Sequence, residues 1–232
     1  MTVRLGIDLG ELEDEPDELY AAAQLAYIAA GGHAGDERSI RRAIERCLAR
    51  GARVGAHPSF DDRAQFGRVD DREITAEALR ATVFAQCARV ARIARSLGCE
   101  ATVLKLHGAL YHRADRDEPM AIAALEGAKD ALGDALTVVA WPDRGTARVA
   151  RSMGFSVLRE GFADRGAHPD GTLIARTEPG ASIRSPLQAL ARAESLVREG
   201  RVDVLCVHGD NPSAVAIARA VRAWIDEGER GS

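Results

Sequence analysis

The stretch Leu104-Lys105-Leu106-His107-Gly108-Ala109 is a short apolar run that ends on a histidine and a glycine. Histidines close similar runs elsewhere, at Gly31-Gly32-His33-Ala34-Gly35-Asp36, Gly55-Ala56-His57-Pro58 and Cys206-Val207-His208-Gly209-Asp210. A fifth run, from Arg4, ends on the carboxylates Asp8 and Glu11. Short apolar runs followed by glycine are typical of buried parallel strands. Ionisable groups at so many strand ends predict side chains that converge at one mouth of an α/β barrel, where such barrels keep their chemistry.

Strands and helices are expected to alternate along the chain. The predicted strands are Val3–Leu9, Gln24–Ala30, Arg53–His57, Thr102–His107, Leu136–Ala140, Ser156–Glu160 and Val204–His208. The predicted helices are Asp36–Arg50, with Asp36 as N-cap, Thr75–Leu97, Pro119–Leu132, Asp143–Met153, Pro186–Glu199 and Pro212–Glu227. This alternation predicts a parallel sheet with right-handed crossovers.

Seven strands favour an irregular, incomplete TIM-like (β/α) barrel that forms one domain over residues 1–232. A doubly wound open sheet is the alternative, but it would gather its site at one switch point, whereas ionisable groups here follow nearly every strand. Two long segments, Pro58–Ile74 and Gly161–Arg184, connect the elements. Loops of that length in a compact domain are usually lids or binding segments.

Composition narrows the classes of partner. The 232 residues are 46% hydrophobic and carry a net charge of −4, which argues against a nucleic-acid footprint. No apolar segment approaches the ~20 residues that cross a bilayer, and no N-terminal stretch resembles a secretory signal. The four cysteines lack paired spacing, so buried free thiols and a cytoplasmic location are expected.

The residues that end the strands are the candidates for chemistry. Asp8 is a candidate general base if burial raises its pKa. Lys105 and His107 alternate on one strand and face the same side, so Lys105 needs an acidic partner such as Asp8 or Asp210, or an anionic substrate. The expected catalytic residues are Asp8, His33, His57, Lys105, His107, His208 and Asp210.

The same end of the predicted barrel offers ligands for an anion or a metal. Arg165 can hold a carboxylate bidentately, and the helix start at Asp36 also favours an anion. Surface positions are expected for His112 and His168. Nitrogen and oxygen ligands suffice for Zn²⁺, but no pair has local metal-binding spacing, so a divalent metal stays open. If one binds, its ligands are expected among Asp8, His57, His107 and His208.

Ordered motifs over almost the whole chain resemble the LamB/YcsF family, which supplies one of the subunits of prokaryotic ATP-dependent 5-oxoprolinase. They are Asp8-Leu9-Gly10-Glu11, Gly31 with His33-Ala34-Gly35-Asp36, Gly55-Ala56-His57-Pro58, Phe66-Gly67-Arg68, Lys105, His107-Gly108-Ala109-Leu110-Tyr111, Phe162-Ala163-Asp164-Arg165, Asp170-Gly171-Thr172-Leu173, Pro179-Gly180-Ala181 and Val207-His208-Gly209-Asp210.

The resemblance implies a fold related to the glycoside hydrolase/deacetylase barrels. It also implies opening of the 5-oxoproline lactam to glutamate with ATP, alongside two partner subunits. The chain lacks a Gly-x-x-x-x-Gly-Lys-[Ser/Thr] phosphate loop, consistent with ATP being handled by those partners. Whether the chain also forms a homo-oligomer stays open. Expected substrate-binding residues are Glu11, Asp36, Phe66, Arg68, Tyr111, Asp164 and Arg165.

The chain departs from the family pattern at several places, among them His112, where the family usually has an asparagine. Gly6 and Tyr27 stand where the family usually has asparagines, Ala30 replaces a cysteine, and Leu106 replaces a proline. Losing a polar group built to contact substrate discriminates by factors of ~10⁴ or more. Two other functions therefore stay open: a metal-dependent amidohydrolase or deacetylase that acts alone, and a non-catalytic binding paralogue.

Overall fold

Seven parallel strands close into a barrel in the computed structural model, which describes residues 3–168 and 171–230. Each strand pairs with the next along the chain, and the last pairs with the first. The strands are β1 (Arg4–Leu9), β2 (Leu25–Ala29), β3 (Arg53–His57), β4 (Val103–Lys105), β5 (Thr137–Ala140), β6 (Ser156–Phe162) and β7 (Val204–His208). The predicted seven-stranded barrel is confirmed. The alternative of a doubly wound open sheet is wrong, because β1 pairs with β7 and the barrel has no open edge.

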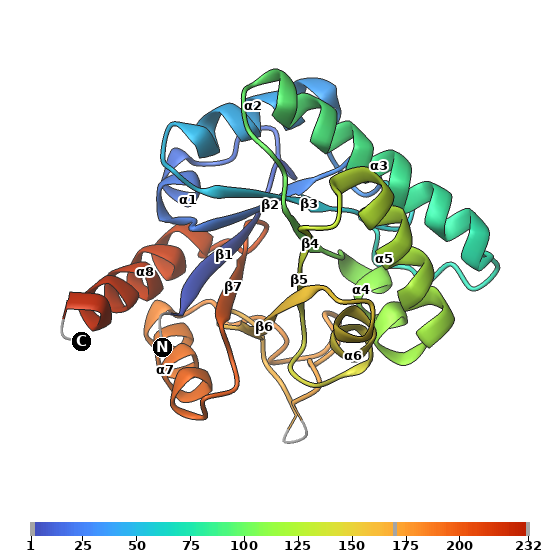
Figure 1. The fold of residues 1–232 in the computed structure, drawn as a ribbon. Coiled ribbons are helices and arrows are strands. Elements are labelled where there is room, and N and C mark those ends of the chain that lie inside the picture. The colour runs from blue at the N-terminus through green and yellow to red at the C-terminus, as the bar shows by residue number, and fades with distance from the viewer. Residues whose placement is uncertain (1–2, 169–170, 231–232) are drawn as a thin grey trace.

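Helices surround the strands on the outside of the barrel, and the described ends of the chain lie on the same side (Figure 1). The helices are α1 (Asp17–Ala22), α2 (Glu37–Leu48), α3 (Ala76–Ser96), α4 (Gly108–Arg116), α5 (Glu118–Leu132), α6 (Gly145–Ser152), α7 (Pro186–Arg198) and α8 (Ala214–Arg230). Among the described residues, no helix is both long and apolar enough to cross a bilayer.

Local sequence explains where several helices begin. The Asp36 carboxylate accepts a hydrogen bond from the backbone of Ser39, which confirms Asp36 as the N-cap of α2. Thr75 caps α3 and Asp117 caps α5 in the same way. Two helices, α1 and α4, were not expected from the sequence. The first has only six residues, and the second follows His107 without a side-chain cap and opens on glycine, a poor helix former.

The barrel interior is built in two layers. Deep inside, Leu25, Tyr27, Val103, Val139 and Val204 form an apolar cluster separate from the larger core between the strands and helices. Alternate residues of a strand share a face, so the next inward positions toward the carboxyl ends include Asp8, His57, Lys105 and His208. The apolar layer therefore forms a floor beneath a polar layer. Cys47, Cys87 and Cys206 are buried free thiols, as expected, whereas Cys99 is half-buried.

Candidate functional site

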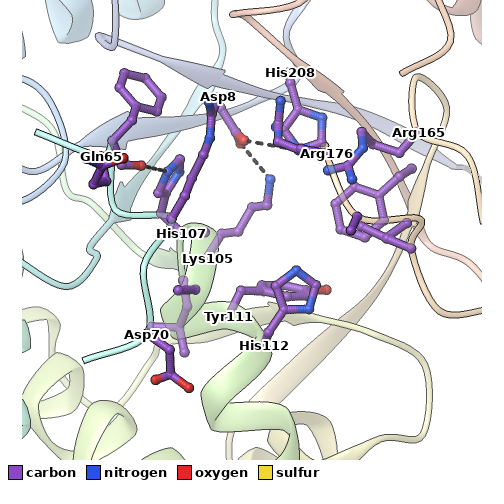
Figure 2. A pocket seen from close by; sticks show the side chains of 18 of the residues that line it. Asp8, Gln65, Asp70, Lys105, His107, Tyr111, His112, Arg165, Arg176 and His208 are labelled. Atoms are coloured by element: carbon purple, nitrogen blue, oxygen red, sulfur yellow. Dashed lines mark hydrogen bonds and ion pairs between the residues drawn. The ribbon is translucent and has the colours of Figure 1, made fainter. Parts of the chain in front are cut away.

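A cavity of about 900 Å³ opens at the carboxyl ends of the strands (Figure 2). Five of the seven expected catalytic residues line it: Asp8, His57, Lys105, His107 and His208. Of the expected substrate-binding residues, Phe66, Arg68, Tyr111 and Arg165 also line it. The structure therefore brings together side chains that lie up to two hundred residues apart in the chain.

Asp8 and Lys105 form a buried ion pair at the base of the cavity. Lys105 Nζ donates to Asp8 Oδ1 at 2.6 Å, and both side chains are almost fully buried. Burial alone would favour the neutral forms. Despite burial, the neighbouring His57 and Lys105 charges hold the pKa of Asp8 well below its ordinary value. Although burial opposes it, Asp8 keeps the pKa of Lys105 well above its ordinary value. Both groups are therefore charged at neutral pH.

The lysine has a second acidic neighbour that the sequence did not reveal as a site residue. Glu160 Oε1 on β6 lies 3.3 Å from Lys105 Nζ, and the residue is buried. Among the described residues, Glu160 Oε2 has no hydrogen-bond partner. The sequence did not mark it clearly, because Glu160 directly follows Arg159 in a strand that also contains Ser156, although it shares the inward face with Phe162.

Tyr27 supports Lys105 from below. Lys105 Nζ lies 4.9 Å from the centre of the Tyr27 ring, within the range of a cation–π contact. A Cβ atom at Gly6 would come within 2.3 Å of the Tyr27 hydroxyl oxygen, so this ring requires a glycine on β1. The two departures from the family pattern on neighbouring strands are thus one substitution in space: the ring fills the volume that the missing side chain at Gly6 leaves.

His208 is held by a buried carboxylate. Its Nδ1–H donates to Asp164 Oδ1 at 2.8 Å, and its backbone N–H donates to Asp164 Oδ2. Asn211 also donates to Asp164, from its side-chain amide. These hydrogen bonds, and the positive charge of His208 when its ring is protonated, outweigh burial and lower the pKa of Asp164. Asp164 does not line the cavity; it fixes the His208 ring so that Nε2 faces Asp8 Oδ2, 4.0 Å away.

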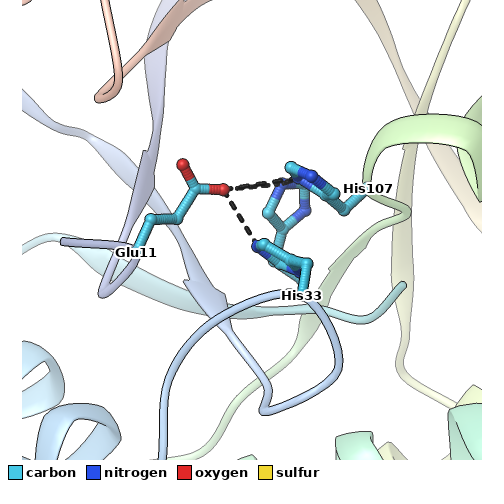
Figure 3. A group of neighbouring side chains, drawn as sticks. Glu11, His33 and His107 are labelled. Atoms are coloured by element: carbon cyan, nitrogen blue, oxygen red, sulfur yellow. Dashed lines mark hydrogen bonds and ion pairs between the residues drawn. The ribbon is translucent and has the colours of Figure 1, made fainter. Parts of the chain in front are cut away.

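Three further imidazoles and one carboxylate gather beside Asp8. Figure 3 shows the carboxylate of Glu11 next to the His33 and His107 rings. Glu11 Oε1 lies 3.0 Å from His33 Nε2 and 3.3 Å from His107 Nδ1. His57 Nε2 lies 3.0 Å from His107 Nδ1 and 3.4 Å from Asp8 Oδ2. His33 and Glu11 lie behind His57 and His107 and do not line the cavity.

The carboxylate with a raised pKa is Glu11, not Asp8. Burial, together with the charge of Asp8, raises the pKa of Glu11 well above its ordinary value. The expectation that burial tunes Asp8 as a base is wrong, because Lys105 and His57 compensate its charge. Burial and the neighbouring imidazoles lower the pKa values of His33 and His107 well below the ordinary value.

Asp210 lies at the rim rather than in the cavity wall. It forms ion pairs with Arg68, from the segment after β3, and with Arg176, from the segment after β6. It therefore links two cavity-lining segments to the end of β7. The expected pairing of Asp210 with Lys105 is not formed. In the turn before α8, the Asn211 side chain accepts a hydrogen bond from the backbone N–H of Ser213.

Two other expected ligand-binding residues have structural partners. Arg165 Nε donates to the Ala181 carbonyl, and its Nη2 donates to the Ile174 carbonyl, so its fork braces the loop that it begins. Asp36 caps α2 and does not line the cavity. The motif residue Asp170 of the same loop lies outside the described residues.

One side of the cavity is rich in arginine, and the sequence did not single it out. Arg116 and Arg176 line it with Arg68 and Arg165, and His112 lies among them. Burial and the charges of Arg165 and Arg116 lower the pKa of His112 to about 4. The expectation that His112 lies at the surface is wrong, because it packs against Trp141 and Tyr111. His168 is exposed, as expected.

The expected metal ligands fall into two groups. His57 and His107 lie with Glu11 and His33, whereas His208 lies with Asp8 and Cys206. The sequence could not separate the groups, because spacing along the chain does not encode which ring nitrogen faces which neighbour. Asp8 lies between the groups, 3.4 Å from His57 Nε2 and 4.0 Å from His208 Nε2.

Known proteins share this chain's sequence and fold. The sequence pattern of the LamB/YcsF family matches residues 4–231. The A-type 5-oxoprolinase subunit of Pyrococcus furiosus is 35% identical over 247 aligned positions, which cover 98% of this chain and 95% of that protein. The corresponding 5-oxoprolinase subunit of Pyrococcus abyssi is also 35% identical, with the same coverage.

Solved structures agree. A lactam utilization protein from Thermus thermophilus superposes with a TM-score of 0.89 at 32% identity, covering 99% of this chain and 98% of that one. A family 4 carbohydrate esterase from Streptomyces lividans shares only the fold, with a TM-score of 0.54 and 12% identity over 98% of this chain and 88% of that one. The chain belongs to the LamB/YcsF family.

Proposed function

We propose that this chain opens the lactam ring of 5-oxoproline to give glutamate, within an ATP-dependent assembly that includes two partner subunits. The names of its relatives in Pyrococcus and Thermus support this substrate class. The observation that carries the proposal is the cavity wall, where Asp8 on β1 lies beside His208 on the adjacent strand β7. Asp8 forms an ion pair with Lys105, and Asp164 holds His208 from outside the cavity.

The reaction sets the chemical demands. Water adds its oxygen to the lactam carbonyl carbon, the C–N bond breaks, and the departing nitrogen takes a proton. An unstrained amide is a poor electrophile, so ATP held by the partner subunits would first phosphorylate the amide oxygen and leave as ADP. After the water has added and the C–N bond has broken, the phosphoryl group would remain on the new carboxyl as an acyl phosphate, which a second water hydrolyses to the carboxylate and phosphate. The residues of this chain then need to accept a proton from water and stabilise negative charge.

His208 is the group best placed to accept the proton. Asp164 holds Nδ1–H, which leaves the lone pair of Nε2 on the side of the cavity. A carboxylate behind an imidazole fixes the tautomer and stabilises the imidazolium that forms. Lys105 stays charged and lines the cavity, so its ammonium can stabilise an oxyanion.

The arginine-rich side of the cavity suits the carboxylate of 5-oxoproline. Arg116 and Arg176 line this side beside His112. A guanidinium binds a carboxylate with two parallel hydrogen bonds. Arg165 contributes positive charge, although Nε and Nη2 are committed to backbone carbonyls. We therefore place the substrate carboxylate toward Arg176.

The test is glutamate formation from 5-oxoproline by the chain combined with its two partner subunits. The proposal predicts that turnover requires ATP and all three chains. His208→Ala is expected to reduce this turnover strongly, whereas His168→Ala, which changes an exposed histidine, is expected to keep the wild-type value. Full turnover by His208→Ala, or no turnover by the complete wild-type assembly, overturns it.

A metal-dependent amidohydrolase or deacetylase acting alone is the second candidate. The contact between His57 Nε2 and His107 Nδ1 beside Glu11 favours it. It predicts amide hydrolysis by the chain without ATP or partners once a divalent metal is supplied. A binding paralogue instead predicts ligand stabilisation without turnover, and a ligand at 100 times its Kd adds ~2.7 kcal/mol to the free energy of unfolding.

A further inference from the structure

The His57 and His107 rings face each other in a way that neutral imidazoles do not tolerate. His57 Nδ1 lies 2.7 Å from the Lys105 carbonyl oxygen, and His107 Nε2 lies 3.0 Å from the Phe66 carbonyl oxygen. A carbonyl oxygen only accepts, so both of these nitrogens carry hydrogen. In two neutral rings the remaining nitrogens would both hold lone pairs, yet they lie 3.0 Å apart. Their repulsion requires a cation between them.

A carboxylate completes the group. Glu11 Oε1 lies 3.3 Å from His107 Nδ1 and 3.9 Å from His57 Nε2, and its side chain is 2% exposed (Figure 3). The sides of this triangle are 3.0, 3.3 and 3.9 Å. Ligands about 2.1 Å from a tetrahedral zinc ion lie roughly 3.4 Å from one another, which is close to the mean of these sides.

We infer that Glu11 Oε1, His57 Nε2 and His107 Nδ1 bind a divalent transition metal ion, with Zn²⁺ as the ion that suits this donor set best. Two imidazoles and one carboxylate are a ligand set of catalytic zinc centres, which keep a fourth position open. His57 and His107 line the cavity, and Asp8 Oδ2 lies 3.4 Å from His57 Nε2 on that side. The open position therefore lies toward Asp8.

His33 has a different role, although its Nε2 lies within 4.8 Å of the three donors. Its ring stacks on the His107 ring, with parallel planes and centres 3.6 Å apart. Lone pairs in two parallel planes cannot both point at one ion. His33 Nε2–H instead donates to Glu11 Oε1 at 3.0 Å. It is thus a positioning residue that orients the carboxylate, as outer partners of metal ligands do.

The carbonyl partners of the two imidazoles strengthen the assignment. Histidines that bind metals commonly donate their other N–H to a backbone carbonyl or a carboxylate, which fixes the tautomer and the ring orientation. The Lys105 and Phe66 carbonyls do this here for His57 and His107. The competing cation is a proton shared by the two imidazoles, and the experiment below separates the two.

The experiment measures metal binding without turnover, so it does not depend on the identity of the substrate. Full-length chain without an affinity tag is stripped with a chelator and titrated with ZnCl₂ by calorimetry, and with CoCl₂ by visible absorption. The expected result is one ion per chain for the wild type. His107→Ala and the near-isosteric Glu11→Gln are expected to weaken Zn²⁺ binding most.

His33→Ala is expected to lose about 10–100-fold in affinity, as outer partners do, and to keep the stoichiometry of one. His168→Ala is the matched control and is expected to bind as the wild type does. Circular dichroism checks that each variant is folded. If His107→Ala does not fold, the near-isosteric Glu11→Gln still tests the site. If the wild type does not bind Zn²⁺ or Co²⁺ stoichiometrically, the inference is overturned, and the cation between the two imidazoles is a shared proton. Wild-type affinity in folded Glu11→Gln and His107→Ala also overturns it.

The outcomes separate this inference from the proposed function. Zinc binding without 5-oxoproline turnover in the complete assembly leaves the metal centre standing and removes the proposed reaction. ATP-dependent turnover by a chain that binds no metal does the reverse.

Discussion

At the scale of single residues, the His208–Asp164 pair is the feature on which the proposed chemistry depends most. His208→Ala removes the group that accepts the proton and is expected to lower kcat by about 10²–10⁴. Asp164→Asn keeps the size of the side chain, but it replaces one of the two accepting oxygens with an NH2 donor and removes the negative charge that stabilises an imidazolium, so it is expected to lower kcat with little change in KM. Steady-state kinetics of the complete assembly measure both. A kcat within twofold of wild type for His208→Ala contradicts this role.

His112 gives a pH dependence whose sign is fixed by its environment. Burial and the neighbouring arginines lower its pKa to about 4 in the folded chain, whereas in the unfolded chain the pKa is about 6.5. The unfolded state therefore binds the proton first as the pH falls. Stability from the neutral ring is complete above the unfolded pKa and is lost between about pH 6.5 and pH 4, by up to about 1.4 kcal/mol per pH unit.

His112→Gln removes this titration. The measurement is denaturant unfolding of the wild type and the variant from pH 4 to pH 7.5. All other titrating groups contribute equally to the two proteins, so the difference between their curves reports His112. The wild-type free energy of unfolding is expected to fall more steeply with acid than that of the variant. Parallel curves show that His112 keeps its ordinary pKa.

At the scale of elements, Gly6 on β1 and Tyr27 on β2 are coupled. Gly6→Ala places a Cβ atom 2.3 Å from the Tyr27 hydroxyl oxygen and is expected to cost about 1–3 kcal/mol. Tyr27→Ala leaves a cavity in the barrel and is expected to cost about 3–5 kcal/mol. The loss of unfolding free energy in the double variant is expected to be smaller than the sum of the two single losses by at least about 1 kcal/mol, as measured by denaturant unfolding. Simple additivity contradicts the contact.

The two long segments over the cavity are joined through Asp210. Its ion pairs with Arg68 and Arg176 are partly exposed, and such pairs are worth about 1 kcal/mol or less. Asp210→Asn is therefore expected to raise KM for 5-oxoproline up to about fivefold and to leave kcat near wild type. If kcat falls by about a hundredfold or more, Asp210 has the catalytic role that was expected from the sequence.

At the scale of the whole molecule, the sequence predicted the barrel because its signals are local. Most strands are short apolar runs that end at or close to a glycine or a histidine, and this pattern can be recognised without knowing which residues pack against the strand. Strand ends were less predictable: Thr102–His107 shortens to β4 (Val103–Lys105), because the chain turns into α4 directly after His107. The helix α4 has no capping side chain to announce it.

The site was predictable only in part, for a physical reason. Convergence of Asp8, Lys105 and the strand-end histidines follows from the parallel barrel, and these residues do meet. The partners of each side chain do not follow from it. The bracing of Arg165 by loop carbonyls, the burial of Glu160 beside Lys105 and the arginines around His112 depend on loop paths and side-chain packing. Neither leaves a periodic trace in the sequence.

The location of the substrate tests the account most directly. A crystal structure of the chain with 5-oxoproline is expected to show the lactam in the cavity, with its carbonyl oxygen toward Lys105, its ring beside His208 and its carboxylate toward Arg176. A lactam bound outside this cavity, or one whose carboxylate points at Asp8 and away from the arginines, contradicts the account.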